Sequence, residues 1–153
     1  QRFNLETTVV VKEIDPNGKM FKNVSRLFVE CQRKSMAMII DVHNKLCPAK
    51  VGDTFRVLIS DCLEDDLDAP CVSWTSDAEI KTRRMDRFDY VMCGKIYRID
   101  QVDRRAAADP GEEGSVDQLR QELLVYVSFG GLLMRIQGDS RELDKLATDL
   151  QIY

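Results

Sequence analysis

The chain has 153 residues, of which 44% are hydrophobic and 31% charged, and this excludes a disordered protein and suits one folded domain. Its net charge of −4 argues against a nucleic-acid-binding domain that contacts phosphates over its whole surface, although a local basic stripe stays compatible with this charge. No apolar run approaches the roughly 18 residues of a membrane-spanning helix, and no secretory leader is recognisable behind Gln1.

The cysteines give no sign of a disulfide framework or a metal site. Their number is odd, their spacings are wide, and no Cys-x-x-Cys pair occurs. Because zinc sites and small disulfide scaffolds use clustered or evenly paired cysteines, we expect the reduced thiols of an intracellular protein. The five are Cys31, Cys47, Cys62, Cys71 and Cys93.

The first part of the chain alternates between apolar and polar side chains. Only a half-buried β-strand gives this period of two, because its successive side chains point to opposite faces of a sheet. The pattern predicts strands at residues 7–13, 24–32, 36–43 and 54–60. An Asp-Pro-Asn-Gly cluster at residues 15–18 predicts a turn after the first strand, since these residue types favour turn conformations.

Two segments break the alternation. Residues 61–87 begin acidic and end basic, and they predict a long mobile loop, because few apolar residues are present to offset the entropy of ordering. Residues 101–120, which contain an Asp-Pro-Gly turn, form a second soft segment. Between the two, residues 88–100 predict another strand, and Gly94 in its middle favours a bulge or a sharp bend.

The clearest local signal is a hairpin near the end of the chain. Alternating runs at residues 123–129 and 132–136 flank Gly130-Gly131, and the favoured two-residue turns need the positive φ angles that glycine adopts readily. We expect a loop at residues 138–149 and the beginning of a last strand at 150–153. Seven or eight short antiparallel strands predict an all-β sandwich or barrel, in one domain that spans residues 1–153.

Motifs for catalysis and metal binding are missing. His43 is the only histidine, and without a Gly-x-Ser-x-Gly motif or clustered cysteines we expect it at the surface or rim. Gly130-Gly131 lacks the Gly-Lys-Ser/Thr of a phosphate-binding loop, and the acidic residues after Ser60 lack the spacing of a calcium loop. We therefore expect no enzymatic activity, no cofactor and no metal ligand.

Two long stretches carry a family resemblance. Residues 88–99 (Phe-Asp-Tyr-Val-Met-Cys-Gly-Lys-Ile-Tyr-Arg-Ile) and 126–139 (Tyr-Val-Ser-Phe-Gly-Gly-Leu-Leu-Met-Arg-Ile-Gln-Gly-Asp) resemble signatures of the common small barrel subunit of eukaryotic nuclear RNA polymerases I, II and III, the RPABC3-type family. Residues 14–27 and 52–56 are similar to its opening hairpin and to a later strand. The resemblance runs from residue 11 to residue 153, and residues 61–87 and 101–120 depart from it.

The resemblance implies an antiparallel barrel of about eight strands, similar to the oligonucleotide-binding (OB) fold. It also implies a non-catalytic nuclear subunit that packs on the largest polymerase subunit. Partner contacts are expected where the signatures combine glycine with aromatic and basic residues, because Tyr and Arg are frequent interface anchors. These residues are Lys95, Tyr97, Arg98, Phe129, Gly130, Gly131, Leu133 and Arg135. Leu132 and Met134 face the other way from Leu133 and are expected in the core.

A single-stranded nucleic-acid-binding OB protein is the alternative. OB faces place basic residues beside aromatic ones, so that bases stack while phosphates are neutralised. Two groups fit this description: Lys95, Tyr97 and Arg98, and Arg26, Phe28 and Arg135. The same residues also suit the polar outer face of a barrel, and the acidic net charge leaves at most weak and non-specific binding of nucleic acid as the expectation.

Overall fold

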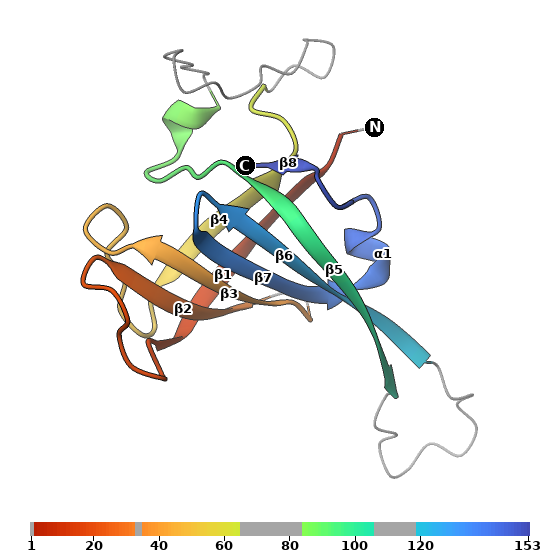
Figure 1. The fold of residues 1–153 in the computed structure, drawn as a ribbon, viewed down its shortest axis with the longest axis horizontal. Helices are drawn as coiled ribbons and strands as arrows, with labels where there is room; N and C mark the ends of the chain where they lie inside the picture. Colours follow the sequence, from red (N-terminus) through yellow and green to blue (C-terminus); the bar gives the residue numbers. More distant parts are fainter. Residues whose placement is uncertain (1, 33–34, 65–83, 106–118) are drawn as a thin grey trace.

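One curled antiparallel sheet makes up nearly all the regular structure in the computed structural model, which describes residues 2–32, 35–64, 84–105 and 119–153 (Figure 1). The strands are β1 (Asn4–Ile14), β2 (Val24–Cys31), β3 (Ala37–His43), β4 (Thr54–Ser60), β5 (Gly94–Arg105), β6 (Leu119–Phe129), β7 (Leu132–Asp139) and β8 (Gln151–Ile152). Two short helices accompany them in the described ranges, the 3-10 turn η1 (Met85–Arg87) and α1 (Ser140–Leu143). No helix in these ranges has the length and hydropathy needed to cross a membrane.

The sheet curls until its two edge strands meet at one end. Its order is β4-β1-β2-β3-β7-β6-β5-β8, so β4 and β8 are the edges. Ser60 at the end of β4 donates its N–H to the Tyr153 carbonyl at 3.0 Å and accepts the Tyr153 N–H at 2.8 Å. The sheet is therefore a half-barrel that one residue pair joins across its edges, and the predicted all-β, barrel-like class is confirmed.

The core fills the inner face of the sheet because the strands alternate residue by residue. In β1, Leu5, Val9 and Val11 point inward, while the residues between them are more exposed. Each large aliphatic side chain buried in this way stabilises the fold by about 1.5–3 kcal/mol. Apart from Cys62, the most deeply buried side chains come from β1, β5, β6, β7, β8 and α1: Val9, Val11, Ile96, Val125, Val127, Ile136, Leu143 and Ile152.

β5 differs from the strand predicted at residues 88–100. Residues 88–93 are irregular chain, and Gly94 begins the strand rather than bending its middle. The predicted bulge exists, but it lies further along, since Ile96 pairs with Val127 while Arg98 pairs with Tyr126. The placement of the bulge at the glycine was therefore wrong.

Gly94 is required for a steric reason. A Cβ atom at this position would lie 2.2 Å from the Ser128 carbonyl oxygen and 2.8 Å from Cδ1 of Phe129. Contacts this close force the chain or the neighbouring strand to move. The glycine therefore lets β5 start directly against the end of β6.

The predicted soft segment at residues 101–120 contains more regular structure than expected. β5 continues to Arg105 and β6 already begins at Leu119, so the ends of the 101–120 segment belong to a long antiparallel pair. Residues 106–118 and 65–83 lie outside the described residues, and the expected mobility of the 61–87 loop stays a prediction. The described ends of that loop are held together, because Nη1 of Arg84 donates to the Cys62 carbonyl at 2.9 Å and the Glu64 carbonyl at 3.2 Å.

The end of the chain is also more ordered than the predicted loop at residues 138–149. β7 runs to Asp139, whose carboxylate accepts the Arg141 N–H at 2.9 Å and thereby caps α1. Leu143 of α1 is fully buried against the core. The expected last strand is confirmed as β8, which pairs with Gly94 and Lys95.

Candidate functional site

The strand register aligns five side chains across the outer, solvent-facing side of the sheet. Phe28 pairs with Ile39, Ile39 with Arg135, Arg135 with Tyr126 and Tyr126 with Arg98. Phe28, Tyr126 and Arg135 each lie between two buried inner residues, and the register places Ile39 and Arg98 on the same outward side. This row, called the outer row below, crosses β2, β3, β7, β6 and β5.

The β5 bulge adds Tyr97 to the outer row. In a regular strand, Tyr97 and Arg98 would point to opposite faces. Because the pairing with β6 skips Tyr97, both side chains are instead directed to solvent. Tyr97 is 47% exposed, and the Arg98 side chain is 63% exposed. The bulge thus presents an aromatic and a cationic side chain together, which matches the usual role of bulges in re-aiming side chains.

These side chains hold one another in place. The rings of Tyr97 and Tyr126 lie 6.1 Å apart at an angle of 50°, and the Arg98 guanidinium lies 5.5 Å from the centre of the Tyr126 ring. Arg98 also pairs with Asp100, with Nε to Oδ1 at 3.0 Å and Nη2 to Oδ2 at 2.9 Å. The hydrogen bond to Asp100 raises the pKa of the guanidinium above its ordinary value. Ring contacts and ion pairs of this kind leave less side-chain entropy to be lost on binding.

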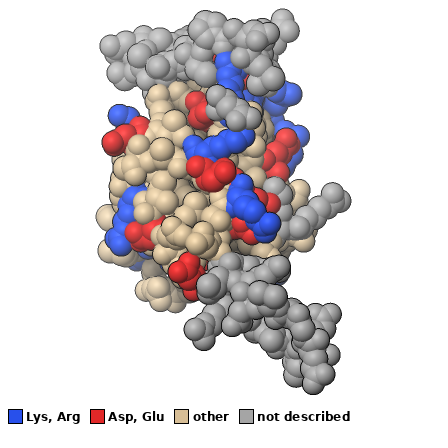
Figure 2. Space-filling view, turned by 90° about the vertical axis from the view of Figure 1, so that its right-hand side faces the viewer, with Lys and Arg blue, Asp and Glu red and all other residues tan. Residues whose placement is uncertain are grey.

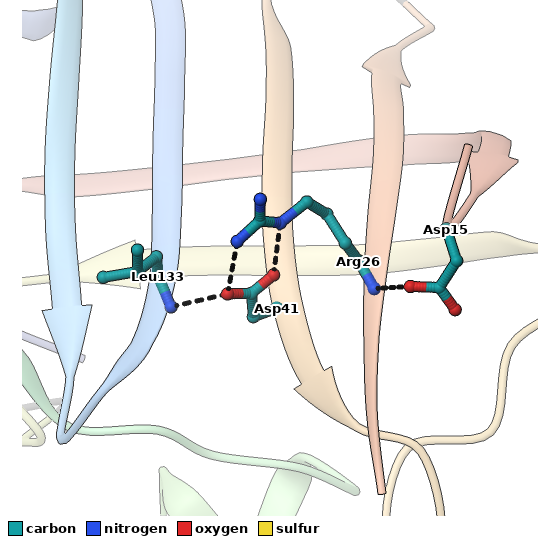
Figure 3. A network of polar contacts seen from close by, with 4 residues as sticks. All are labelled: Asp15, Arg26, Asp41 and Leu133. Carbon is teal, nitrogen blue, oxygen red and sulfur yellow. Dashed lines mark hydrogen bonds and ion pairs between the residues drawn. The ribbon is translucent and has the colours of Figure 1, made fainter. Parts of the chain in front are cut away.

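Asp41 organises the neighbouring part of the outer face (Figure 3). Its Oδ1 accepts Nε of Arg26 at 2.7 Å, and its Oδ2 accepts both Nη2 of Arg26 and the backbone N–H of Leu133 at 3.1 Å. The Asp41 side chain is 9% exposed, whereas that of Arg26 is 47% exposed. Asp41 therefore carries a nearly buried charge that is satisfied from β2 and β7 at once.

Arg26 is held from its backbone as well. Its N–H donates to Oδ1 of Asp15 at 2.8 Å, in the turn that joins β1 and β2. The hydrogen bond to Asp41 raises the pKa of the Arg26 guanidinium, although partial burial opposes this shift. Arg26 thus links the turn between β1 and β2, through its backbone N–H, to Asp41 of β3, through its guanidinium.

The predicted hairpin is confirmed, and it divides the predicted site residues between two faces. Gly130 and Gly131 form its exposed turn with φ angles of +63° and +109°. Leu133 is 40% exposed on the outer face, whereas Met134 is buried in the core as expected. Phe129 instead packs against the core.

The outer face therefore gathers five of the eight predicted partner-binding residues. These are Lys95, Tyr97, Arg98, Leu133 and Arg135, with the two glycines at the hairpin tip beside them. Sequence reasoning missed Tyr126 and Asp41. Counting alternate positions along β6 would have placed Tyr126 outward, and the one acidic residue inside the otherwise apolar β3 was the signal for Asp41.

Charges of both signs are interspersed on the surface. Figure 2 shows Lys and Arg clusters next to Asp and Glu clusters on the face it displays, separated by uncharged surface. On the outer face, Arg26 and Arg98 are each paired with an aspartate. Interspersed charges of this kind suit specific polar contacts with a protein better than a continuous row of phosphate groups.

The described residues contain no group of side chains arranged for metal binding. The Nδ1 atom of His43 accepts the Leu46 N–H at 3.4 Å, and its backbone N–H donates to the Tyr90 hydroxyl at 3.1 Å, which gives it a rim position. Cys31, Cys47 and Cys93 form no disulfide, which agrees with the predicted reduced thiols. Burial, together with the nearby Asp89 carboxylate, raises the pKa of Cys47. Cys62 is disulfide-bonded, so the expectation of a reduced thiol was wrong there.

Comparison with known proteins places this geometry in a family. The profile of the family described as "RNA polymerase Rpb8" matches residues 6–153. A Caenorhabditis briggsae protein named "Probable DNA-directed RNA polymerases I, II, and III subunit RPABC3" is 35% identical over 143 residues, which cover 94% of this chain and 87% of the relative. An Arabidopsis thaliana protein named "DNA-directed RNA polymerases II, IV and V subunit 8B" is 32% identical over 97% of this chain and 90% of its own length.

A more distant relative also matches most of the chain. The Saccharomyces cerevisiae protein named "DNA-directed RNA polymerases I, II, and III subunit RPABC3" is 28% identical over 89% of this chain and 85% of its own length. The family profile spans all eight strands, except for the first two residues of β1, and includes both signature segments. This chain belongs to the RNA polymerase Rpb8 family.

Proposed function

We propose that this chain is a non-catalytic structural subunit of the nuclear DNA-directed RNA polymerases I, II and III and that it binds their largest subunit. Membership of the Rpb8 family supports a role as a polymerase subunit. The nematode and yeast relatives are named as subunits of all three enzymes, and this supports a shared subunit that works in the nucleus. The Arabidopsis relative is named for polymerases II, IV and V, so the set of enzymes differs among relatives.

The single observation that carries the binding proposal is the composition and order of the outer row. Tyr97 and Tyr126 supply large amphipathic contact area, and Arg98 and Arg135 supply charge beside it. Tyr and Arg dominate the binding energy of many protein interfaces, particularly where their side chains are fixed before association. Ile39 within the row and Leu133 beside it add apolar area, so the surface is mixed, as at many subunit interfaces.

Single-stranded nucleic acid is the second candidate ligand, because stacked tyrosines beside arginine also suit bases and phosphates. The charges favour a protein partner. Asp41 neutralises Arg26, and Asp100 neutralises Arg98, so two of the cations on this face are already occupied. Each phosphate contact would have to compete with an existing carboxylate.

Co-purification of an Arg98→Glu variant tests the proposal. The substitution replaces the cation over the Tyr126 ring by a charge that Asp100 repels, while the inward residues of β5 stay unchanged. We expect the affinity for the polymerase to fall by about 2 kcal/mol or more, as for interface anchors of this type. The thermal melt of the variant should stay close to that of the wild type.

Arg141→Glu is the matched control. Arg141 makes the same two-residue pair with Asp139, with Nη2 to Oδ2 at 3.0 Å, but it lies on α1 rather than on the outer face. We expect it to co-purify like the wild type. Equal recovery of both variants would refute the outer face as the binding site, and a wild-type chain that recovers no polymerase subunit would refute the function itself.

A further inference from the structure

β4 presents an unpaired edge over most of its length. It pairs with β1 on one side, and on the other side only Ser60 is bonded, through the two hydrogen bonds to Tyr153. In an edge strand, the backbone N–H and C=O groups of every second residue point away from the neighbouring strand. The groups of Thr54, Arg56 and Leu58 therefore point to the same open edge as those of Ser60. Within the described part of the chain, no backbone hydrogen bond reaches these groups.

An apolar cavity of about 710 Å³ borders this edge. Every residue of β4 lines it, from both faces of the strand, and this arrangement requires the cavity to run along the edge itself. Inward-facing core residues such as Val29, Met38 and Met134 form its floor. Its volume lies in the range of about 300–1,000 Å³ that is typical of ligand-binding pockets.

Most residues of the 84–92 segment also line the cavity, without pairing with β4. Arg56 lies 5.0 Å from the centre of the Phe88 ring, and the Tyr90 hydroxyl accepts the backbone N–H of His43, so side chains anchor this segment. The described backbone of residues 84–92 makes no hydrogen bond to β4. The cavity therefore has strand-pairing groups along β4 and apolar side chains at its base.

We infer that the β4 edge and its cavity receive an extended segment of a partner polymerase subunit, which pairs with β4 as an additional strand. The unpaired groups of Thr54, Arg56 and Leu58 select an extended chain, because only a strand offers donors and acceptors at this spacing. The apolar cavity selects apolar side chains at alternate positions, since every second side chain of such a strand points inward. Phe129 of the β6–β7 hairpin lines the cavity, so the cavity adjoins this hairpin, which also flanks the proposed outer face.

This inference rests on the proposed function, and hydrogen exchange in the assembled complex tests it on the unmodified protein. The amides of Arg56 and Leu58 should exchange at least about tenfold more slowly when the full chain is bound to purified polymerase, because they become hydrogen-bonded. The amides of Phe55 and Val57 point toward β1 and should be protected in both states. Unchanged exchange at Arg56 and Leu58 in the bound chain would overturn the inference.

A pair of substitutions at one position provides the second readout. Arg56→Pro removes the outward N–H at an edge position where proline is tolerated, whereas Arg56→Ala removes the same side chain and keeps the N–H. Polymerase recovery should be about five- to tenfold lower for the proline variant than for the alanine variant, the effect of losing about one hydrogen bond. Thermal melts identify a proline variant that fails to fold, and the exchange measurement then decides.

The outcomes separate the two proposals. Equal recovery of folded Arg56→Pro and Arg56→Ala, together with a defect in Arg98→Glu, would overturn the edge site and leave the proposed function standing. A wild-type chain that recovers no polymerase would overturn both.

Discussion

At the scale of single residues, Asp41 shows how one carboxylate shapes the proposed binding face. Regular pairing between β3 and β7 ends at Ile40 and Met134. At the next position the Asp41 side chain, rather than a backbone carbonyl, accepts the Leu133 N–H. The same carboxylate orients Arg26, so an apolar and a cationic residue of the outer face share one anchor.

The first prediction is that Asp41→Ala lowers the free energy of unfolding by about 2–4 kcal/mol. The substitution leaves the Leu133 N–H without its acceptor and removes the partner of the half-exposed Arg26. Chemical denaturation measures the change. Asp100→Ala is the control, because its pair with Arg98 is mostly exposed and such pairs contribute at most about 1 kcal/mol. Equal losses in the two variants would show that Asp41 has no special structural role.

At the scale of elements, alternation along the sequence predicted β1 to β4 and the β6–β7 hairpin because each of these strands has one dry face and one wet face. It failed at the start of β5. Residues 88–93 look strand-like, but they are irregular chain, from which Tyr90 packs against the core. The close approach of Gly94 to Ser128 and Phe129 joins distant parts of the chain, and a local pattern does not contain it.

The second prediction compares two glycines. Gly94→Ala should lower the free energy of unfolding by about 1–3 kcal/mol, the usual cost of forcing an extra methyl group into a packed site. Gly130→Asn should be neutral within about 0.5 kcal/mol, because a Cβ at Gly130 meets open space and Asn-Gly is a favoured hairpin turn. Denaturant titration of both variants provides the test. A harmless Gly94→Ala would mean that β5 and β6 are not closely packed at this point.

At the scale of the whole molecule, the proposed site is an outer face beside a half-open barrel. The sequence indicated most of its residues through the family resemblance, and the exposure of Tyr97, Arg98 and Leu133 agrees with that placement. The sequence did not indicate the ion pairs on this face or the unpaired edge of β4. Asp41 meets Leu133 because β3 and β7 pair in antiparallel register, whereas the curl of the sheet brings the end of β4 to Tyr153.

The third prediction separates a protein-binding face from a nucleic-acid-binding one. The isolated chain should bind a fluorescein-labelled single-stranded oligonucleotide weakly, and this binding should fade steeply as salt rises, because it depends on exchange of counterions around phosphates. The net charge of −4 and the aspartate partners of Arg26 and Arg98 are the reasons. Fluorescence anisotropy from about 50 to 200 mM salt measures the dependence.

Tyr97→Ala distinguishes the two ligands within the same experiment. The substitution removes a ring that is 47% exposed and 6.1 Å from Tyr126, so it deletes interface area and a potential base-stacking surface together. Polymerase recovery should fall by about tenfold, since buried tyrosine anchors contribute more than about 1 kcal/mol, while the weak oligonucleotide binding should hardly change. The opposite result, salt-resistant oligonucleotide binding lost in Tyr97→Ala with full polymerase recovery, would assign the outer row to nucleic acid.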